Sequence, residues 1–184
     1  MMNTGNQPAL LDRSAIYKFI ILILIGALGF YVGRREIGND LLNQYVLLFY
    51  CTGKTVYFMK IFFDRIRQTA HKDLLHTDIL PFIGYNALLI VISFGIDYLC
   101  LYEINNSSFS GITTREHLFP HLIAFFYFSV SVFSTAGLGD IIPRNTTAQI
   151  LVSSQMMLSW FLTILVIANF TGIRDAFKQK THKP

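Results

Sequence analysis

The sequence predicts an all-α membrane protein with four membrane-spanning helices and one shorter re-entrant helix. Hydrophobic residues make up 53% of the 184 residues and charged residues only 14%, whereas soluble domains carry about 25% charged residues. Four apolar runs are long enough to cross about 30 Å of hydrocarbon as helices, and a fifth is too short. The net charge of +4 suits anionic lipid headgroups better than a nucleic-acid groove, so membrane lipids are expected partners and nucleic acid is not. The two cysteines, Cys51 and Cys100, lie in apolar runs, which indicates buried thiols rather than a disulfide framework.

Two of the predicted spans lie in the N-terminal part of the chain. The first covers residues 15–32. The second covers residues 41–63 and contains two lysines, so an interfacial helix is an alternative; a spanning helix is favoured because an even number of spans places the later short segment correctly. The lysines, Lys54 and Lys60, do not form the regular arginine series of a voltage-sensing helix. We interpret them as structural or snorkelling side chains.

The third and fourth predicted spans, residues 79–102 and 150–170, flank an unusual segment. An apolar run over residues 120–133, too short to cross the membrane, precedes the sequence Ser134-Thr135-Ala136-Gly137-Leu138-Gly139-Asp140. Glycines at alternate positions favour a backbone with positive φ. Irregular backbone at membrane depth persists only where it is wrapped in protein or lines a water-filled path, so this segment is a candidate pore lining. An ordinary loop turn is the alternative.

The same segment resembles the pore signature of the potassium-channel superfamily. The sequence Thr135-Ala136-Gly137-Leu138-Gly139-Asp140 follows an aromatic-rich apolar helix and precedes Ile141-Ile142-Pro143, and the family consensus reads Thr-Val-Gly-Tyr-Gly-Asp. The resemblance covers roughly residues 79–172, with two extra N-terminal transmembrane helices before it. A Gly-x-Gly-Asp sequence alone would be weak evidence, but its place between two spans makes the resemblance specific.

The resemblance implies a role for each residue of the motif. Residues 135–139 would form a selectivity filter, whose backbone carbonyls replace the hydration shell of the ion. Asp140 would lie at the filter mouth, adding negative charge or bracing the filter through a hydrogen bond. Because one chain supplies one such segment, the resemblance implies a homotetramer that conducts potassium passively, with no cofactor beyond K⁺ ions bound in the filter. The residues that would coordinate potassium are Thr135, Ala136, Gly137 and Leu138, with Gly139 completing the filter.

The last span is expected to line the cavity below the filter. Four of its residues recur at three- or four-residue spacing and so share one helix face, although helix packing explains that face equally well. Ser159 stands where the family often has a hinge glycine, which stiffens the helix there and favours gating at the filter. The candidate cavity residues are Trp160, Thr163, Ile167 and Thr171.

Two filter positions depart from the family consensus. Leu138 replaces the usual tyrosine and lacks the hydroxyl that would tie the filter to the surrounding helices, and Ala136 replaces valine, which removes packing behind the carbonyl. Beside a potassium-selective channel, two alternatives stay open: a weakly selective cation channel and a non-conducting regulatory channel subunit. An enzyme is disfavoured, because no nucleophile–base pair or metal-ligand cluster falls in one stretch of the sequence.

Several other polar residues have more than one interpretation. Asp97, late in the third span, is expected to bond to the re-entrant helix or to the outer loop, and a functional intramembrane acid is the alternative. His117 and His121, four residues apart at the start of the re-entrant helix, offer two imidazoles for a metal or for sensing protons, with little support from other ligands. Ser131 and Ser134 either brace the filter or satisfy local backbone carbonyls.

The basic residues outside the predicted spans favour a topology with both termini in the cytoplasm, because more of them lie in the segments that this topology places inside. The chain is therefore expected to be an integral protein of the plasma membrane or of a bacterial inner membrane. The predicted organisation is a cytoplasmic N-terminus (1–14), a two-helix peripheral transmembrane region (15–63), a cytoplasmic linker (64–78), a pore domain (79–172) and a cytoplasmic tail (173–184).

Overall fold

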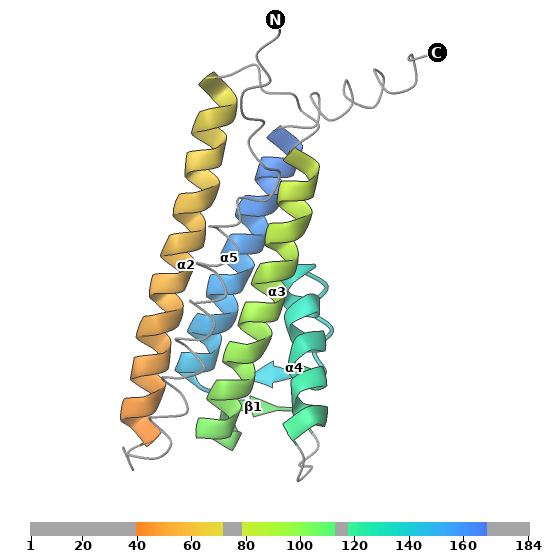
Figure 1. Cartoon of the computed structure of the whole chain (residues 1–184). Helices are drawn as coiled ribbons and strands as arrows, with labels where there is room; N and C mark the ends of the chain where they lie inside the picture. The colour runs from red at the N-terminus through yellow and green to blue at the C-terminus, as the bar shows by residue number, and fades with distance from the viewer. Residues whose placement is uncertain (1–39, 72–78, 113–117, 169–184) are drawn as a thin grey trace, which may run out of the picture.

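The computed structural model describes residues 40–71, 79–112 and 118–168. Within them lie the helices α2 (Asp40–His71), α3 (Ile79–Ile104), α4 (Leu118–Phe133) and α5 (Thr146–Ala168), which Figure 1 shows. The smaller elements are a 3-10 helix, η2 (Asn106–Ser108), and the short strands β1 (Phe109–Ser110) and β2 (Ile142–Pro143). Some predictions fall outside the described residues, namely those for the N-terminus (1–14), the first span (15–32), the tail (173–184), His117 and Thr171.

Three of these helices are long and apolar enough to cross a membrane, over Leu42–Asp64, Ile83–Ile104 and Thr146–Ile167. They coincide with the second, third and fourth predicted spans, and the prediction of an all-α membrane protein is confirmed. Helix α2 differs from expectation at its end, because it continues to His71 into the predicted linker. The residues that extend it include good helix formers and neither glycine nor proline, so nothing in them stops the helix.

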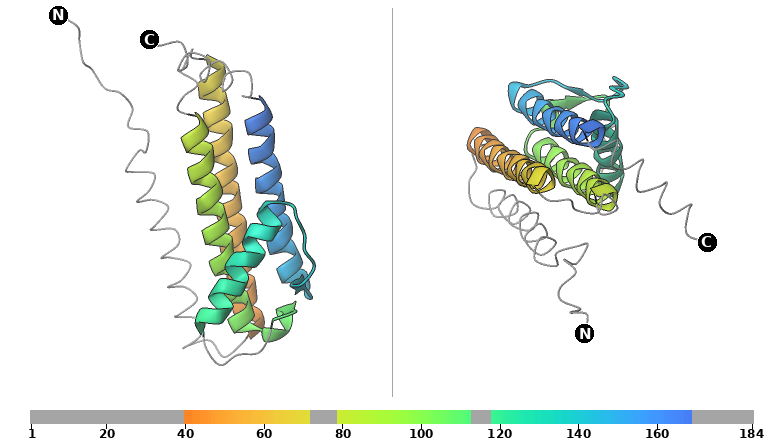
Figure 2. Two further views of the ribbon diagram at one scale, coloured as in Figure 1. Left: turned by 90° about the vertical axis from the view of Figure 1, so that its right-hand side faces the viewer. Right: turned by 90° about the horizontal axis from the view of Figure 1, so that it is seen from above.

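Helix α3 is the central element of the bundle. It packs against α2, α4 and α5 and runs antiparallel to both α2 and α5 (Figures 1 and 2). The ring of Phe109, from β1, packs on Tyr98 of α3 and on Phe125 of α4, with centroid separations of 5.7 and 5.2 Å. The segment between α3 and α4 is thereby anchored through Phe109 in the same core as the helices. The largest fully buried apolar side chains of this core are Phe58, Ile90, Phe94, Tyr98, Leu101, Phe125, Leu151, Leu158 and Leu165.

Helix α4 has the re-entrant arrangement that the sequence predicts. In the left view of Figure 2, α4 starts beside the strands, ends part-way along α3 and α5, and is followed by a segment that returns toward the same end. Strands β1 and β2 pair antiparallel, with Phe109 opposite Pro143 and Ser110 opposite Ile142. This pairing holds the entrance and the exit of the re-entrant segment together.

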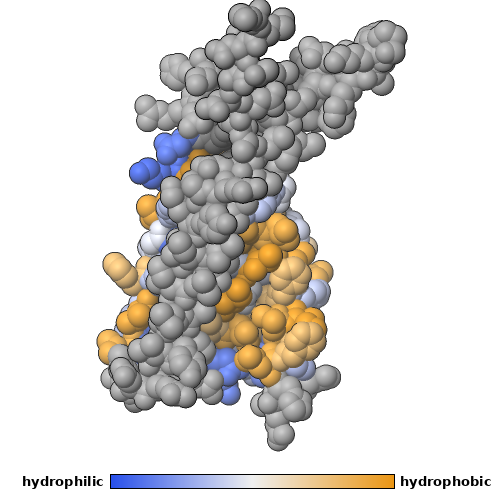
Figure 3. Space-filling view, viewed as in Figure 1, coloured by the Kyte–Doolittle hydropathy of each residue, from blue (hydrophilic) through white to orange (hydrophobic). Residues whose placement is uncertain are grey.

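Large apolar side chains cover much of the outer surface of the helices. Figure 3 shows them gathered over α3 and α4, and they also occur along α5. Apolar surface of this extent requires lipid or protein neighbours rather than water, which agrees with an integral membrane protein. The exposed apolar residues of α4 and α5 include Phe119, Ile123, Phe126, Val130, Met157, Trp160, Ile164 and Ile167.

Candidate functional site

The segment that follows α4 has an alternating backbone conformation. Thr135, Gly137 and Gly139 have φ angles of 57°, 56° and 78°, while the residues between them do not have positive φ. Positive φ is easy for glycine but costs a β-branched residue such as Thr135 about 1–3 kcal/mol, and strain of this kind gathers at functional sites. Alternation of positive and negative φ can turn successive carbonyls toward one side, which is the arrangement that a carbonyl-lined cation path needs.

The N–H groups of this segment face the end of α4. Ser131 provides most of the acceptors: its carbonyl accepts from the N–H groups of Ala136 at 3.0 Å and Gly137 at 3.4 Å, and its hydroxyl accepts from the N–H of Leu138 at 3.3 Å. In the described part of the chain, no donor reaches the carbonyls of these three residues, and residues 134–140 are all exposed. One side of the segment is therefore held by α4, and its carbonyl oxygens are free to coordinate a cation.

Comparisons with known proteins agree with this arrangement. Residues 87–173 match the protein-family model described as "Ion channel". This match, over just under half of the chain, supports the resemblance to the potassium-channel superfamily. Ninety-two residues are 34% identical to "Two-pore potassium channel 4" of Arabidopsis thaliana and cover 48% of this chain and 30% of the plant protein, so the chain spans less than a third of that relative's length. No solved structure shows a significant match.

The ion-channel match and the potassium-channel relative indicate a channel rather than an enzyme. The matched residues include the short re-entrant helix α4 and the last long apolar helix, α5. Of the two roles that the sequence leaves open for Ser131, bracing of the segment after α4 is the one that the structure shows. Ser134 has the local role, because its hydroxyl donates to the Ser131 carbonyl at 3.2 Å.

Asp140 is braced against the re-entrant helix. The hydroxyl of Tyr127, on α4, donates to the Asp140 carboxylate, and this bond is the main cause that lowers the pKa of Asp140 from its ordinary value. A second bond comes from the N–H of Ile141, 2.9 Å from Asp140 Oδ1. The influence of Tyr127 on the pKa of Asp140 agrees with the bracing role that the sequence leaves open, and the exposed carboxylate keeps its negative charge.

The segment that follows α3 is fastened to the residues just after Asp140. Arg144 donates its backbone N–H to the Ser108 carbonyl at 2.8 Å and its Nε to the Ser110 hydroxyl at 2.8 Å. Gly111 has a φ of 92°, and a Cβ atom there would lie 1.7 Å from the Asp140 carbonyl oxygen. Only glycine fits this approach, a requirement that is invisible in the sequence because residues 111 and 140 are far apart along the chain.

The candidate residues of α5 divide into exposed and buried ones. Trp160 and Ile167 are 62% and 69% exposed, and Thr163 is also exposed, which leaves this face free in the single chain. Ser159 is buried, and its hydroxyl donates to the Phe133 carbonyl at the end of α4. Helix α5 continues unbroken through this position.

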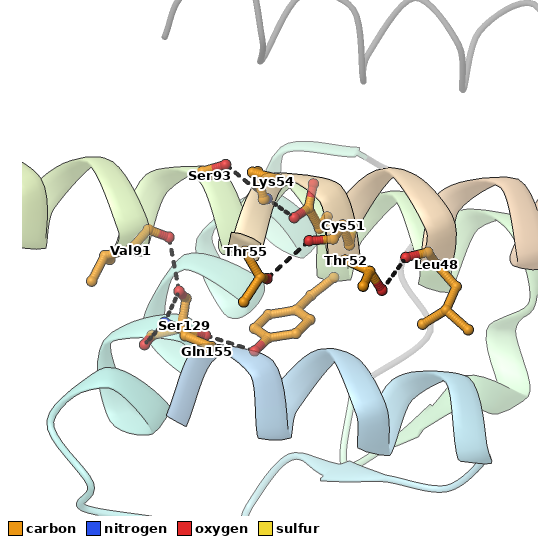
Figure 4. A network of polar contacts seen from close by, with 11 residues as sticks. Leu48, Cys51, Thr52, Lys54, Thr55, Val91, Ser93, Ser129 and Gln155 are labelled. Carbon is orange, nitrogen blue, oxygen red and sulfur yellow. Dashed lines mark hydrogen bonds and ion pairs between the residues drawn. The ribbon is translucent and has the colours of Figure 1, made fainter. Parts of the chain in front are cut away.

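The prediction for Asp97 is wrong. Instead of bonding to α4 or the outer loop, Asp97 forms an ion pair with Lys54 of α2, and Lys54 Nζ also lies 2.8 Å from the Ser93 hydroxyl (Figure 4). A charge at membrane depth needs an opposite charge, but the sequence does not say which helix faces α3. Lys54 is buried, which confirms its interpretation as a structural lysine, and Cys51 and Cys100 are free buried thiols as predicted.

His121 contacts a carboxylate. Its Nδ1 lies 3.4 Å from Glu103 Oε1, and its ring packs edge-on against Tyr102 with centroids 5.1 Å apart. Among the described residues, no three His, Cys, Asp or Glu side chains come together as a metal site.

The sequence analysis did not predict a role for Gln155, which is a buried residue of α5. The only signal for it in the sequence is an amide side chain within an apolar span.

Proposed function

We propose that this chain forms a homotetrameric potassium-selective channel, in which residues 135–139 are the selectivity filter. The observation that carries this proposal is the two-sided character of the segment: the N–H groups of residues 135–138 bond to α4, while the carbonyls of residues 136–138 accept no bond from the described part of the chain. Rings of such carbonyls replace the hydration shell of a permeating ion. The coordinating carbonyls are those of Thr135, Ala136, Gly137 and Leu138, and Gly139 provides the positive φ that ends the filter.

Assembly from four copies follows from the geometry of coordination. One chain offers one row of carbonyls and cannot surround an ion, so several copies of the segment must meet at an axis. The apolar exposed faces of α4 and α5 supply surface for such contacts. In that assembly, Trp160, Thr163 and Ile167, together with Thr171, line the cavity below the filter.

Electrostatics support a cation as the permeating species. Helix α4 ends at Phe133, next to the filter, and the C-terminal end of a helix carries about half an elementary negative charge. Asp140 adds a full negative charge at the other end of the filter, because its lowered pKa keeps it ionised at neutral pH. In the proposed topology both termini are cytoplasmic, and the strands lie on the outer side of a plasma membrane or bacterial inner membrane.

A weakly selective cation channel is the second candidate, and Leu138 is the residue that favours it. Its side chain is 60% exposed and carries no hydroxyl, so only its backbone N–H, bonded to the Ser131 hydroxyl, and not its side chain, ties the filter at this position. Reversal potentials under mixed potassium and sodium distinguish the two candidates: a selective pore follows the potassium gradient alone.

The proposal is tested with purified full-length protein in liposomes. We expect potassium flux from the wild type and none from Gly137→Ala, because alanine opposes the positive φ of 56°. A Cβ atom at Gly137 would meet nothing within 4 Å in its own chain, so the variant should still assemble as a tetramer. The matched control is Gly53→Ala on α2, where a Cβ also meets nothing and φ is ordinary. Full flux from Gly137→Ala would contradict the filter assignment.

A further inference from the structure

Two polar side chains of α5 meet two backbone carbonyls of α4 at the same spacing. Gln155 and Ser159 are four residues apart, and so are their acceptors, Ser129 and Phe133. Gln155 Nε2 donates to the Ser129 carbonyl at 2.9 Å, and the Ser159 hydroxyl donates to the Phe133 carbonyl. Because residues four apart lie on one face of a helix, these bonds fix α5 against α4 in one register.

The Gln155 amide is fully engaged. Its Nε2 also lies 2.9 Å from the Ser129 hydroxyl, and its Oε1 accepts from the hydroxyl of Tyr98 on α3 at 2.6 Å. The Ser129 hydroxyl in turn donates to the Val91 carbonyl of α3 at 2.8 Å (Figure 4). Gln155, Ser129 and Tyr98 are all completely buried. One closed network therefore joins three helices, and no solvent competes with its bonds.

The Ser159 bond differs from the Gln155 bonds, because its acceptor is the carbonyl of the last residue of α4. The last four carbonyls of a helix have no partner within the helix, and Phe133 is the final residue of α4. Ser159 satisfies that carbonyl from α5. A bend of α5 at this position would have to break the bond or pull the end of α4 with it.

The end of α4 is also what holds the filter. Ser131 lies between the two residues that α5 contacts, and it accepts hydrogen bonds from the N–H groups of Ala136, Gly137 and Leu138. The hydrogen bonds of α5 and those of the filter therefore meet on the same turn of α4, whose rigid backbone connects the inner helix to the carbonyls that coordinate the ion. Packed elements of this kind shift between discrete positions rather than deforming continuously.

We propose that Gln155 and Ser159 are positioning residues for the filter, so that the position of α5 decides whether the carbonyls stand in their ion-selective arrangement. This inference rests on the proposed channel function and adds to it the residues that couple the inner helix to the filter. Neither residue touches the ion; both act through α4 and Ser131.

The test compares Gln155→Met and Ser159→Ala with wild type in planar bilayers, using full-length protein under mixed potassium and sodium. Methionine keeps approximately the length of glutamine without its donors. Loss of one positioning bond is expected to lower the potassium-to-sodium permeability ratio roughly fivefold, while tetramer assembly is retained. Ser159→Thr, which keeps the hydroxyl, should restore the ratio. A purely structural bond would change the yield of assembled protein without changing the selectivity of each open channel.

Two controls on α5 match these variants. Ser154→Ala removes a hydroxyl that bonds only to its own helix, at the Ile150 carbonyl, and Gln149→Met replaces an exposed glutamine; both should behave as wild type. Permeability ratios of Gln155→Met and Ser159→Ala equal to wild type would overturn the inference and leave the channel proposal intact. If Gln155→Met does not assemble, the permeability ratio of Ser159→Ala, which is the smaller change, tests the inference. Absence of flux in wild type would overturn the channel proposal itself, and this inference with it.

Discussion

The ammonium group of Lys54 and the carboxylate of Asp97 form a buried ion pair between α2 and α3. The side chain of Lys54 is 0% exposed and that of Asp97 is 7% exposed. The Ser93 hydroxyl lies within hydrogen-bonding distance of the same ammonium, and the ring of Phe94 lies 4.3 Å from it. Helix α2 also packs against α5, with Phe63 and Phe161 in edge contact at 5.9 Å. The pair and this contact therefore fasten α2 to α3 and α5.

Removal of one member of this pair should destabilise the protein strongly. In Lys54→Met, Asp97 stays buried without its counter-charge, and broken buried pairs cost about 3–5 kcal/mol. We expect a large fall in the thermal unfolding temperature in detergent. The double variant Lys54→Met with Asp97→Leu should recover much of the loss, because no charge is then stranded. Lys60→Met, at an exposed lysine of the same helix, is the control, and an equal effect there would argue against the pair.

The bond between Tyr127 and Asp140 should set the response of the channel to external acid. The bond lowers the pKa of Asp140, so its stabilising effect is complete above the ordinary carboxyl pKa and is lost as pH falls through the lowered value. In Tyr127→Phe the pKa of Asp140 should rise, and loss of potassium current on external acidification should begin at a higher pH than in wild type. Tyr45→Phe, at an exposed tyrosine of α2, should leave the pH profile unchanged. Identical profiles for Tyr127→Phe and wild type would count against this role of the bond.

Gly111 should be essential for the seating of the outer loop. In Gly111→Ala, the added Cβ would lie 1.7 Å from the Asp140 carbonyl oxygen, and the φ of 92° disfavours alanine. We expect the loop to move away from the filter end and the protein to lose about 1–3 kcal/mol of stability, measured by chemical or thermal unfolding. Gly84→Ala, where a Cβ meets nothing within 4 Å, should be close to neutral. Equal stability of the two variants would refute the close approach.

The exposed face of α5 should be accessible to water in the assembled channel. Ile167→Cys should react with a membrane-impermeant thiol reagent applied from the cytoplasmic side, and the reaction should reduce potassium current. Leu158→Cys should be protected, because Leu158 is completely buried. The native thiols of Cys51 and Cys100 are buried and should give little background. Protection of Ile167→Cys would favour helix packing over cavity lining for this face.

Periodicity and composition determined the elements of this protein but not their partners. Membrane thickness fixes the length of a crossing helix. Within residues 41–170, three apolar runs are long enough to predict spans. The run over residues 120–133 is too short and predicts a re-entrant helix. The glycines of the motif likewise predicted an irregular backbone. These are local properties, and local sequence is enough to decide them.

Contacts between distant residues were decided by the tertiary structure alone. The sequence shows a lysine in one span and an aspartate in another, but helix rotation decides that Lys54 faces Asp97 rather than lipid. It shows a glutamine in the last span, but only the crossing of α5 over α4 gives Gln155 two acceptors on Ser129. In an apolar medium, a polar side chain must find its partner wherever packing brings one, and packing is a property of the whole bundle.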